Sequence, residues 1–404
     1  MKTSENVDLF QHISLQIRAL KLTGFYIFTS HNPKSYMFWI VVLSRIVFGV
    51  FIFVLPIMGQ FLYFVRLVLS DNAEVQEAAG IINLVLTELL ISLKLLDLSL
   101  RRNSLLELKE QMQRKEFLHF SLPQKTIIEG SVKLSKKLFF WIFIGAGVDI
   151  AVHIIVVPAI KKFQVLPVKM DFIFFDADGR YFNFLCLYQI LYKPVILTIF
   201  SAMQTMRWAF MLCTSNQLDV LIYNFENMKE LVKAGNCEIN EAFKDGFKKN
   251  IVHHCAIIQF VDTIGRAFGG QILLFFMINS FIICTTAVQF FSIPNPLNNI
   301  MELVWIFGFL FIMIIMLYID CYFGTIITEK VNGKRGSQIS MIVYCFPWID
   351  LQQDLKNLLI IFFVRNQQEL VINASKLIPV SMTTFRKVMN WTYKGFAVLN
   401  QMKK

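Results

Sequence analysis

The sequence predicts an all-α membrane protein with seven transmembrane helices, and two features of its composition carry that prediction. Hydrophobic residues make up 56% of the 404 residues, 41 residues are phenylalanine, and the mean hydropathy is +0.56, which is too apolar for an ordinary soluble protein. The apolar residues are also gathered in blocks of about 20, the helical length that spans the ~30 Å hydrocarbon core of a bilayer. A bundle of membrane-spanning helices is therefore expected.

Seven such blocks follow one another along the chain, and each is expected to form one transmembrane helix. They lie at 37–65, 77–98, 138–160, 184–212, 267–291, 300–325 and 380–402. A further apolar stretch at 355–364 is flanked by charged residues and is only about half as long as a span must be. We expect it to form a helix buried within protein rather than an eighth crossing.

Lysine and arginine are distributed unevenly among the segments that connect these blocks. Segments 1–36, 99–137, 213–266 and 326–379 together hold 25 of these residues, whereas the segments on the other side of the membrane hold 7. Basic residues accumulate on the cytoplasmic side, so we expect the N-terminus to be cytosolic and the C-terminus to be extracellular. Cytosolic basic loops also account for the net charge of +11 without any nucleic-acid partner.

The last predicted helix, 380–402, is unusually polar for a transmembrane segment. Asn390, Lys394, Val398 and Gln401 recur at helical spacing and therefore share one face. A mixed polar face is what a pore-lining helix needs, but it equally suits a helix buried against its neighbours, which satisfy its polar groups. The residues of this helix alone do not decide between the two interpretations.

Four ionisable residues lie well inside the predicted spans: Glu88, Asp149, His153 and Lys193. Charged groups in a membrane usually form functional sites or internal pairs, although they can also reach the surface or internal water. Their similar depth leads to the hypothesis that Lys193 pairs with Asp149 or Glu88. Lys193 also precedes Pro194, where a helix kink is expected.

The C-terminal third of the chain resembles the insect odorant receptors, a family of seven-span ligand-gated cation channels. The residues that carry the resemblance are Phe346-Pro347-Trp348, Leu358-Leu359, Arg365 and Gln367, Ala374 with Lys376-Leu377, Thr384-Phe385 and Tyr393 to Leu399, together with His254 and Ile257-Ile258. Each motif is loose, but their order and spacing are fairly specific. The orientation expected from the charges agrees with the family.

The resemblance implies a tetramer whose central pore is lined by the final helix of each subunit. It places Val398 and Met402 at the gate and Gln401 on the conduction path, with Asn390 and Lys394 further along the same face. Lys394 departs from the family pattern, because a lysine on the path would repel cations; it would then point into a subunit interface instead. The short segment between 213 and 266 is similar to that of an odorant-specific subunit, which assembles with a common co-receptor.

The resemblance also divides the chain by role. It implies a cytosolic N-terminal segment (1–36), a six-span ligand-binding helical bundle with cytosolic helical extensions (37–325), a cytosolic anchor segment (326–379), and a pore-lining seventh span with an extracellular tail (380–404). A protein of this kind is expected in the plasma membrane of sensory neurons, in contact with lipid. No cofactor is expected.

An odorant is mostly apolar, so a dry cavity between helices in the outer half of the membrane should bind it. The residues expected to line that cavity are Ile82, Val85, Leu86, Gly147, Ile150, Phe184, Tyr188, Tyr192, Phe281, Trp305 and Phe309. Phe184, Tyr188 and Tyr192 form one aromatic stripe, which ordinary helix packing would also produce.

Other functions are less well supported by the sequence. No phosphate-binding loop, catalytic triad motif or metal-ligand spacing is found, so no catalytic residue or metal ligand is proposed and an enzyme is not expected. A gustatory-type channel of the same wider group is the nearest alternative, and a secondary transporter is the alternative from another class. A transporter would show internal repeats, which the sequence lacks.

Overall fold

The computed structural model describes residues 8–25, 36–70, 75–118, 121–156, 166–171, 181–233, 243–293, 300–332, 336–345, 352–366, 368 and 370–402. These residues are almost entirely helical. The helices are η1 (Leu9–Ile13), α1 (Ser14–Leu22), α2 (Tyr36–Gly49), η2 (Val50–Val54), α3 (Leu55–Leu69), α4 (Val75–Leu100), α5 (Arg102–Met112), η3 (Lys115–Phe117), α6 (Leu122–Ala151), η4 (Val152–Val156), α8 (Phe182–Lys233), η5 (Phe243–Phe247), α10 (Lys248–Phe291), α11 (Ile300–Asn332), α12 (Gly336–Tyr344), α13 (Gln353–Asn366) and α14 (Met382–Met402).

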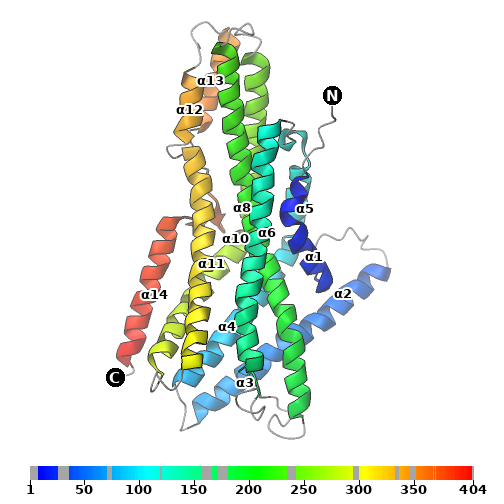
Figure 1. Cartoon of the computed structure of the whole chain (residues 1–404), viewed down its shortest axis with the longest axis vertical. Coiled ribbons are helices and arrows are strands. Elements are labelled where there is room, and N and C mark those ends of the chain that lie inside the picture. The colour runs from blue at the N-terminus through cyan, green and yellow to red at the C-terminus, as the bar shows by residue number, and fades with distance from the viewer. Residues whose placement is uncertain are drawn as a thin grey trace.

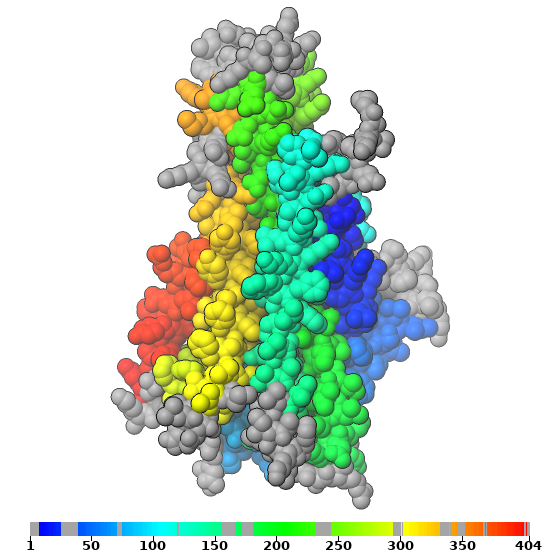
Figure 2. Space-filling view, viewed as in Figure 1, coloured from blue at the N-terminus to red at the C-terminus, as the bar shows by residue number. Residues whose placement is uncertain are grey.

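The helices form an elongated bundle (Figure 1). The long helices α6, α8 and α11 run along its length, while α2 and α3 cross it obliquely. The short helices α12 and α13 cover one end, and α14 lies on the outside of α11 and points its C-terminus toward the other end. Figure 2 shows the same packing, with the side chains of α14 on the flank of the bundle beside α11. The fold class expected from the sequence, an all-α membrane protein, is therefore confirmed.

Five of the described helical segments are long and apolar enough to cross a membrane: Trp39–Leu69, Val75–Leu100, Phe182–Glu230, Lys244–Phe291 and Glu302–Val331. They contain five of the seven predicted spans. The other two predicted spans, 138–160 and 380–402, correspond to the end of α6 plus η4 and to α14, which begins at Met382, two residues later than predicted. Residues 157–160 lie outside the described residues, and seven crossings stay a prediction.

The helices α8 and α10 are far longer than a membrane is thick. At 1.5 Å per residue, the 52 residues of α8 extend over about 78 Å and the 44 residues of α10 over about 66 Å. The predicted helical extensions after the fourth span and before the fifth are thus continuous with those spans. Helix α8 also continues through Pro194, so the proline does not interrupt it.

Helix α13 packs against the ends of α8 and α10 that project beyond the rest of the bundle (Figure 1), and these elements form the projecting end of the bundle. Phe362 of α13 packs its ring against Phe225 of α8, Phe247 of η5 and His254 of α10, with ring centroids 5.4–5.7 Å apart. The apolar side chains of these helices therefore bury one another at this end of the bundle. The segment at 355–364 is a helix within protein and carries both buried and exposed apolar residues.

A two-stranded hairpin links α13 to α14. Strand β1 (Asn373–Ala374) pairs antiparallel with β2 (Ile378–Pro379), and the turn between them places Ser375 and Lys376 at φ of 50° and 62°. These left-handed values are uncommon for residues other than glycine and cost free energy unless the surroundings hold them. The surroundings do so, because a Cβ on Gly269 of α10 would lie only 2.8 Å from the Ser375 backbone nitrogen.

The N-terminal helices are fixed to α6 by a buried histidine. His12 hydrogen-bonds through Nδ1 to the Leu9 carbonyl oxygen at 2.9 Å and through Nε2 to Ser131 Oγ at 2.7 Å. The imidazole is 1% exposed. Burial disfavours its charged form and lowers the pKa of His12 from 6.5 to about 4.

Candidate functional site

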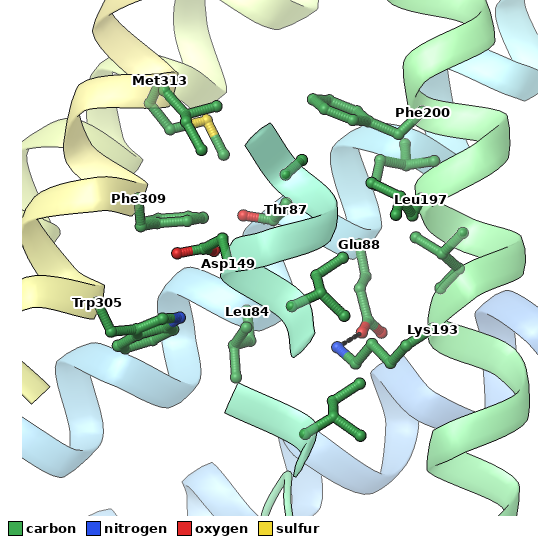
Figure 3. Close-up of a pocket in the computed structure, with 16 residues that line it drawn as sticks. Leu84, Thr87, Glu88, Asp149, Lys193, Leu197, Phe200, Trp305, Phe309 and Met313 are labelled. Carbon is green, nitrogen blue, oxygen red and sulfur yellow. Dashed lines mark hydrogen bonds and ion pairs between the residues drawn. The ribbon is translucent and has the colours of Figure 1, made fainter. Parts of the chain in front are cut away.

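A cavity of about 100 Å³ lies among α4, α6 with η4, α8 and α11. Its wall is predominantly apolar, with a few polar groups that point toward one another (Figure 3), the arrangement typical of a small-molecule site. The lining residues are Leu84, Thr87, Glu88, Ile91, Ala146, Asp149, Ile150, Ile154, Lys193, Ile196, Leu197, Phe200, Trp305, Phe309, Ile312 and Met313.

An ion pair forms part of this wall. Lys193 Nζ donates to Glu88 Oε1 at 2.7 Å, so the hypothesis that Lys193 pairs with an acidic residue at its own depth is confirmed, and Glu88 is the partner. The same oxygen accepts from Gln60 Nε2 at 3.1 Å and from the Tyr192 hydroxyl at 3.3 Å. Such additional hydrogen bonds offset the high desolvation cost of burying two charges.

The second carboxylate oxygen of Glu88 is left without a partner. Glu88 is 2% exposed, and Oε2 makes no hydrogen bond to any described residue. An unsatisfied buried acceptor is costly, by about 1–3 kcal/mol and more when the group is charged. Oε2 is itself buried, so this unsatisfied acceptor lies inside the wall of the cavity that Glu88 helps to line.

Asp149 supplies a second carboxylate on the opposite side of the cavity. Figure 3 shows it beside Phe309 and Trp305 of α11, with Glu88 and Lys193 across the space. The Trp305 side chain lies close enough to hydrogen-bond with it. Gly308 of α11 lies beside this carboxylate, since a Cβ there would be in ordinary van der Waals contact with Asp149 Oδ1, at 3.7 Å.

Of the eleven residues predicted to bind a ligand, the structure brings three together at this cavity: Ile150, Trp305 and Phe309. Trp305 and Phe309 are stacked with ring centroids 6.2 Å apart. Gly147 lies directly behind the wall, because its Cβ position is 3.4 Å from Leu197. Whether any of them contacts a ligand stays a prediction.

The predicted aromatic stripe on α8 is divided between two environments. Tyr188 and Tyr192 stack with centroids 5.0 Å apart, and Tyr192 reaches Glu88 from behind the cavity. Phe184 is 65% exposed, as is Phe281 of α10. Both phenylalanines therefore lie on the outer surface of the bundle, where lipid would contact them.

On α4 the cavity is lined by a different face from the predicted one. Ile82, Val85 and Leu86 do not line it, whereas Leu84, Thr87, Glu88 and Ile91 do, at the i, i+3, i+4 and i+7 positions of one stripe. Glu88 marks this face, because a charge within a span is buried on the protein side. Aliphatic residues such as Leu197 and Ile312 give no comparable signal in the sequence.

The predicted pore residues share the free face of α14. Asn390, Lys394, Val398 and Gln401 are all exposed, whereas Thr384, Val388 and Thr392, on the opposite face, are buried against the bundle. The helix thus packs through one stripe and leaves the predicted stripe uncovered. The position of Met402 in α14 is described, but its side chain lies outside the described residues.

A second hollow, of about 880 Å³, lies between α5, α10 and the hairpin. Its charged lining includes Arg101, Glu107, Arg114, Asp262 and Arg266. Arg266 pairs with Glu107 at 2.8 Å and Arg101 with Asp97 at 2.8 Å. A charged, open surface of this kind does not suit an apolar ligand.

Residues 74–393 match the family model described as 7tm odorant receptor. Odorant receptor 85c of Drosophila melanogaster is 26% identical over 154 residues, which is 38% of this chain and 37% of that protein. Odorant receptor Or2 of Anopheles gambiae is 23% identical over 155 residues, 38% of this chain and 39% of that protein. The chain thus spans well under half the length of these relatives.

The same fold is found in a solved structure. The olfactory receptor OR5 from Machilis hrabei matches with a TM-score of 0.77 and 13% identity, and its complex with eugenol matches with a TM-score of 0.75 and 14% identity; each alignment covers 98% of both chains. At this level of identity the likeness establishes the fold.

Proposed function

Because the chain belongs to the insect odorant receptor family, we propose that it is the odorant-binding subunit of a ligand-gated, non-selective cation channel. The observation that carries the proposal is the predominantly apolar cavity among α4, α6, α8 and α11. A small volatile molecule would bind there and shift the channel toward its open state by binding that state more tightly. The eugenol complex of the Machilis receptor supports a ligand of this kind.

The pore would be lined by α14. Its packed stripe holds the helix on the bundle, and its free stripe of Asn390, Lys394, Val398 and Gln401 would face the conduction path or the neighbouring subunits. In this proposal Val398 and Met402 form the gate near the extracellular end. Lys394 is exposed, which suits either position.

Helix α11 would carry the signal from the cavity to the pore helix. Phe309 and Met313 of α11 line the cavity, and Thr325 of the same helix accepts the Met382 backbone N–H at 2.8 Å through its Oγ1, at the first residue of α14. Next to Thr325, a Cβ on Gly324 would overlap the Val380 carbonyl group. A shift of α11 at the cavity would therefore displace the start of α14.

Assembly into a tetramer with a common co-receptor would use the projecting end of the bundle. Ile360, Ile361 and Val364 of α13 are apolar and more than half exposed, although this end is predicted to lie in the cytosol. Exposed apolar side chains in water favour association. The exposed apolar surface of α2 and α3, by contrast, would contact membrane lipid. The plasma membrane of sensory neurons is the proposed location.

Whole-cell current during exposure to an odorant panel tests this proposal. The chain would be expressed alone and with an odorant receptor co-receptor, and surface labelling would confirm its delivery. Fast cation current that needs no G protein is the expected result. A slow second-messenger response without direct current, from protein at the surface, would contradict the channel function.

The coupling through α11 has its own test. Gly324→Ala should shift or abolish activation by forcing Val380 away from α11, while ligand binding to the purified protein changes little. Gly265→Ala on α10 is the matched control, because nothing lies within 4 Å of a Cβ at that position. Equal currents from both variants would refute the coupling.

A further inference from the structure

The Lys193 ammonium in the cavity wall has more hydrogen-bond donors than the structure uses. It carries three N–H groups, and the acceptor that it has among the described residues is Glu88 Oε1, at 2.7 Å. The Tyr192 ring, which does not line the cavity, has its centre 5.3 Å from Nζ and attracts the positive charge through its face. With one N–H on the carboxylate and at most one toward the ring, at least one N–H remains for another acceptor.

This remaining donor is buried at the cavity. The Lys193 side chain is 8% exposed, and Figure 3 shows it extending from α8 among the lining residues with its nitrogen beside Glu88. A buried donor without an acceptor costs free energy, and the cost is larger when the donor is charged. The cavity that Lys193 lines is therefore the space in which we expect the missing acceptor.

The acceptor should be an uncharged oxygen. Glu88 already balances the charge of Lys193, so an ionised carboxylate would bring an unpaired negative charge into a mostly apolar site, and a cation would be repelled by the ammonium. A water molecule can satisfy the N–H, but a hydrocarbon that displaced this water would leave the donor without a partner. A carbonyl oxygen displaces the water and keeps the hydrogen bond.

From these contacts we infer that Lys193 determines the specificity of the cavity, and that its ligand is a small neutral molecule with an accepting oxygen: a ketone, an aldehyde or an ester. The oxygen accepts from Lys193 Nζ, and the hydrocarbon part packs against Ile150, Leu197 and Phe309, which line the same space. The inference rests on the proposed function and deepens it, because it assigns a chemical class to the ligand and an anchoring residue to the site.

The cavity limits the size of the probes. Its volume of about 100 Å³ is smaller than the roughly 150 Å³ of an apolar cavity that holds benzene. Butanone and 2-methyl-1-butene are a matched pair of suitable size, because the carbonyl oxygen of the first is replaced by a methylene group in the second and the shape is otherwise the same. The third probe is n-butylamine, which is a cation at neutral pH.

Binding is measured on the purified full-length protein, from the rise in melting temperature with increasing concentration of each probe. Water expels the hydrocarbon more strongly than the ketone, so the informative quantity is the ratio of the two dissociation constants and its change on mutation. In Lys193→Met the affinity for butanone relative to 2-methyl-1-butene should fall roughly tenfold to hundredfold, the effect of one hydrogen bond to a charged group. Lys133→Met, at an exposed position of α6 that does not line the cavity, should leave the ratio unchanged.

A second variant protects the test against loss of folding. Lys193→Met alone leaves Glu88 buried without its counter-ion, whereas combining it with Glu88→Gln removes both charges together. The same fall in relative affinity for butanone is expected in the double variant. An unchanged ratio in the double variant would overturn the inference. Preferential binding of n-butylamine, abolished by Asp149→Asn, would also overturn it, because the anchor would then be an acidic residue.

Whole-cell current with the co-receptor separates this inference from the proposed function. Binding of butanone that depends on Lys193, with current that shows the same dependence, supports both. The same binding without current from protein at the cell surface would support the ligand class and contradict the channel function. Current whose relative potency for butanone is the same in wild type and Lys193→Met would support the channel function and overturn the ligand class.

Discussion

The ion pairs Glu88–Lys193 and Arg207–Asp320 are both buried in the helical bundle, but their surroundings differ. Both members of the Arg207–Asp320 pair are fully buried, and both oxygens of Asp320 are occupied: Arg207 Nε and Trp208 Nε1 donate to Oδ1 at 3.1 and 2.5 Å, while Arg207 Nη2 and Gln204 Nε2 donate to Oδ2. Glu88, which helps to line the cavity, receives all its donors on one oxygen, and the other, Oε2, is buried without a partner among the described residues.

This difference separates a structural pair from a binding site. Arg207 Nη1 also lacks a hydrogen bond, so an unpartnered polar atom alone does not mark a site. Arg207 lies in the core, where Lys94 and Arg207 lie 4.1 and 5.7 Å from the centre of the Phe275 ring. Glu88, by contrast, is one of the residues that line the cavity. An unsatisfied group indicates a ligand only when the structure leaves room for one.

The largest expected effect follows from Asp320. In Asp320→Asn the buried guanidinium of Arg207 loses its counter-ion, which should cost about 3–5 kcal/mol of stability. The melting temperature of the purified protein and the amount reaching the cell surface should both fall sharply. The exposed Asp262→Asn should stay within about 0.5 kcal/mol of wild type. If Asp320→Asn and Asp262→Asn melted at the same temperature, the buried Arg207–Asp320 pair would not be the structural pair described above, and the distinction between the two ion pairs would be lost.

A buried polar contact outside the predicted spans gives an independent, pH-dependent test. Because the pKa of His12 is lowered to about 4, the unfolded state binds more protons than the folded state below pH 6.5, and stability falls as the pH decreases from about 6.5 to about 4. The total loss should approach ~3 kcal/mol. Unfolding measured at several pH values should show a shallower acid dependence in His12→Gln; identical profiles would contradict the assignment.

The Glu88–Lys193 pair should behave differently from the core pair. Lys193→Met alone leaves a buried carboxylate without its counter-ion and should cost about 1–3 kcal/mol, and the double variant with Glu88→Gln should recover most of that loss. Neutralising Arg207 and Asp320 together should recover less, because Trp208 and Gln204 also lose their acceptor. Melting of the single and double variants checks both statements, and a double variant worse than either single would contradict the pairing.

The smallest effect on stability is expected for Asp149→Asn. Asp149 forms no ion pair with any described residue, and the asparagine amide has nearly the same shape as the carboxylate. The free energy of unfolding without ligand, followed by thermal melting, should therefore change by less than about 0.5 kcal/mol. Its effect should appear only on ligand preference. A large loss of stability would make Asp149 a structural residue and narrow the difference between the two regions.

The sequence predicts the helices well, because the bilayer requires apolar blocks of about 20 residues and confines most charged residues to the segments between them. It also predicts the Glu88–Lys193 contact in outline, since intramembrane charges seek partners at their own depth. Trp305, Phe309 and Ile150 line the cavity, and their contact with a ligand stays a prediction. On α4 the cavity is lined by residues other than the predicted Ile82, Val85 and Leu86, because Ile82 and Val85 are as apolar as Leu84 and Ile91, and the buried polar residues Asn83, Glu88 and Lys94 lie on different faces of the helix.

Long-range contacts account for the rest. Nothing in the sequence around Gly324 indicates that its missing side chain admits the Val380 carbonyl, because that contact joins helix α11 to a distant residue in the segment that precedes α14. The same is true of Gly269 and the strained turn at Ser375 and Lys376. Such contacts depend on how the helices pack, which local periodicity does not record.

The unbroken course of α8 restricts how the chain can change in length. Lys193 and Leu197 at the cavity and Phe225 at the far end belong to one helix. Inserting a single residue between them would turn one end by about 100° relative to the other and displace it by about 1.5 Å. Either the cavity wall or the contact with Phe362 would then face the wrong way. Insertions and deletions should therefore be confined to the connections between helices, and α8 should keep its number of residues between these two points.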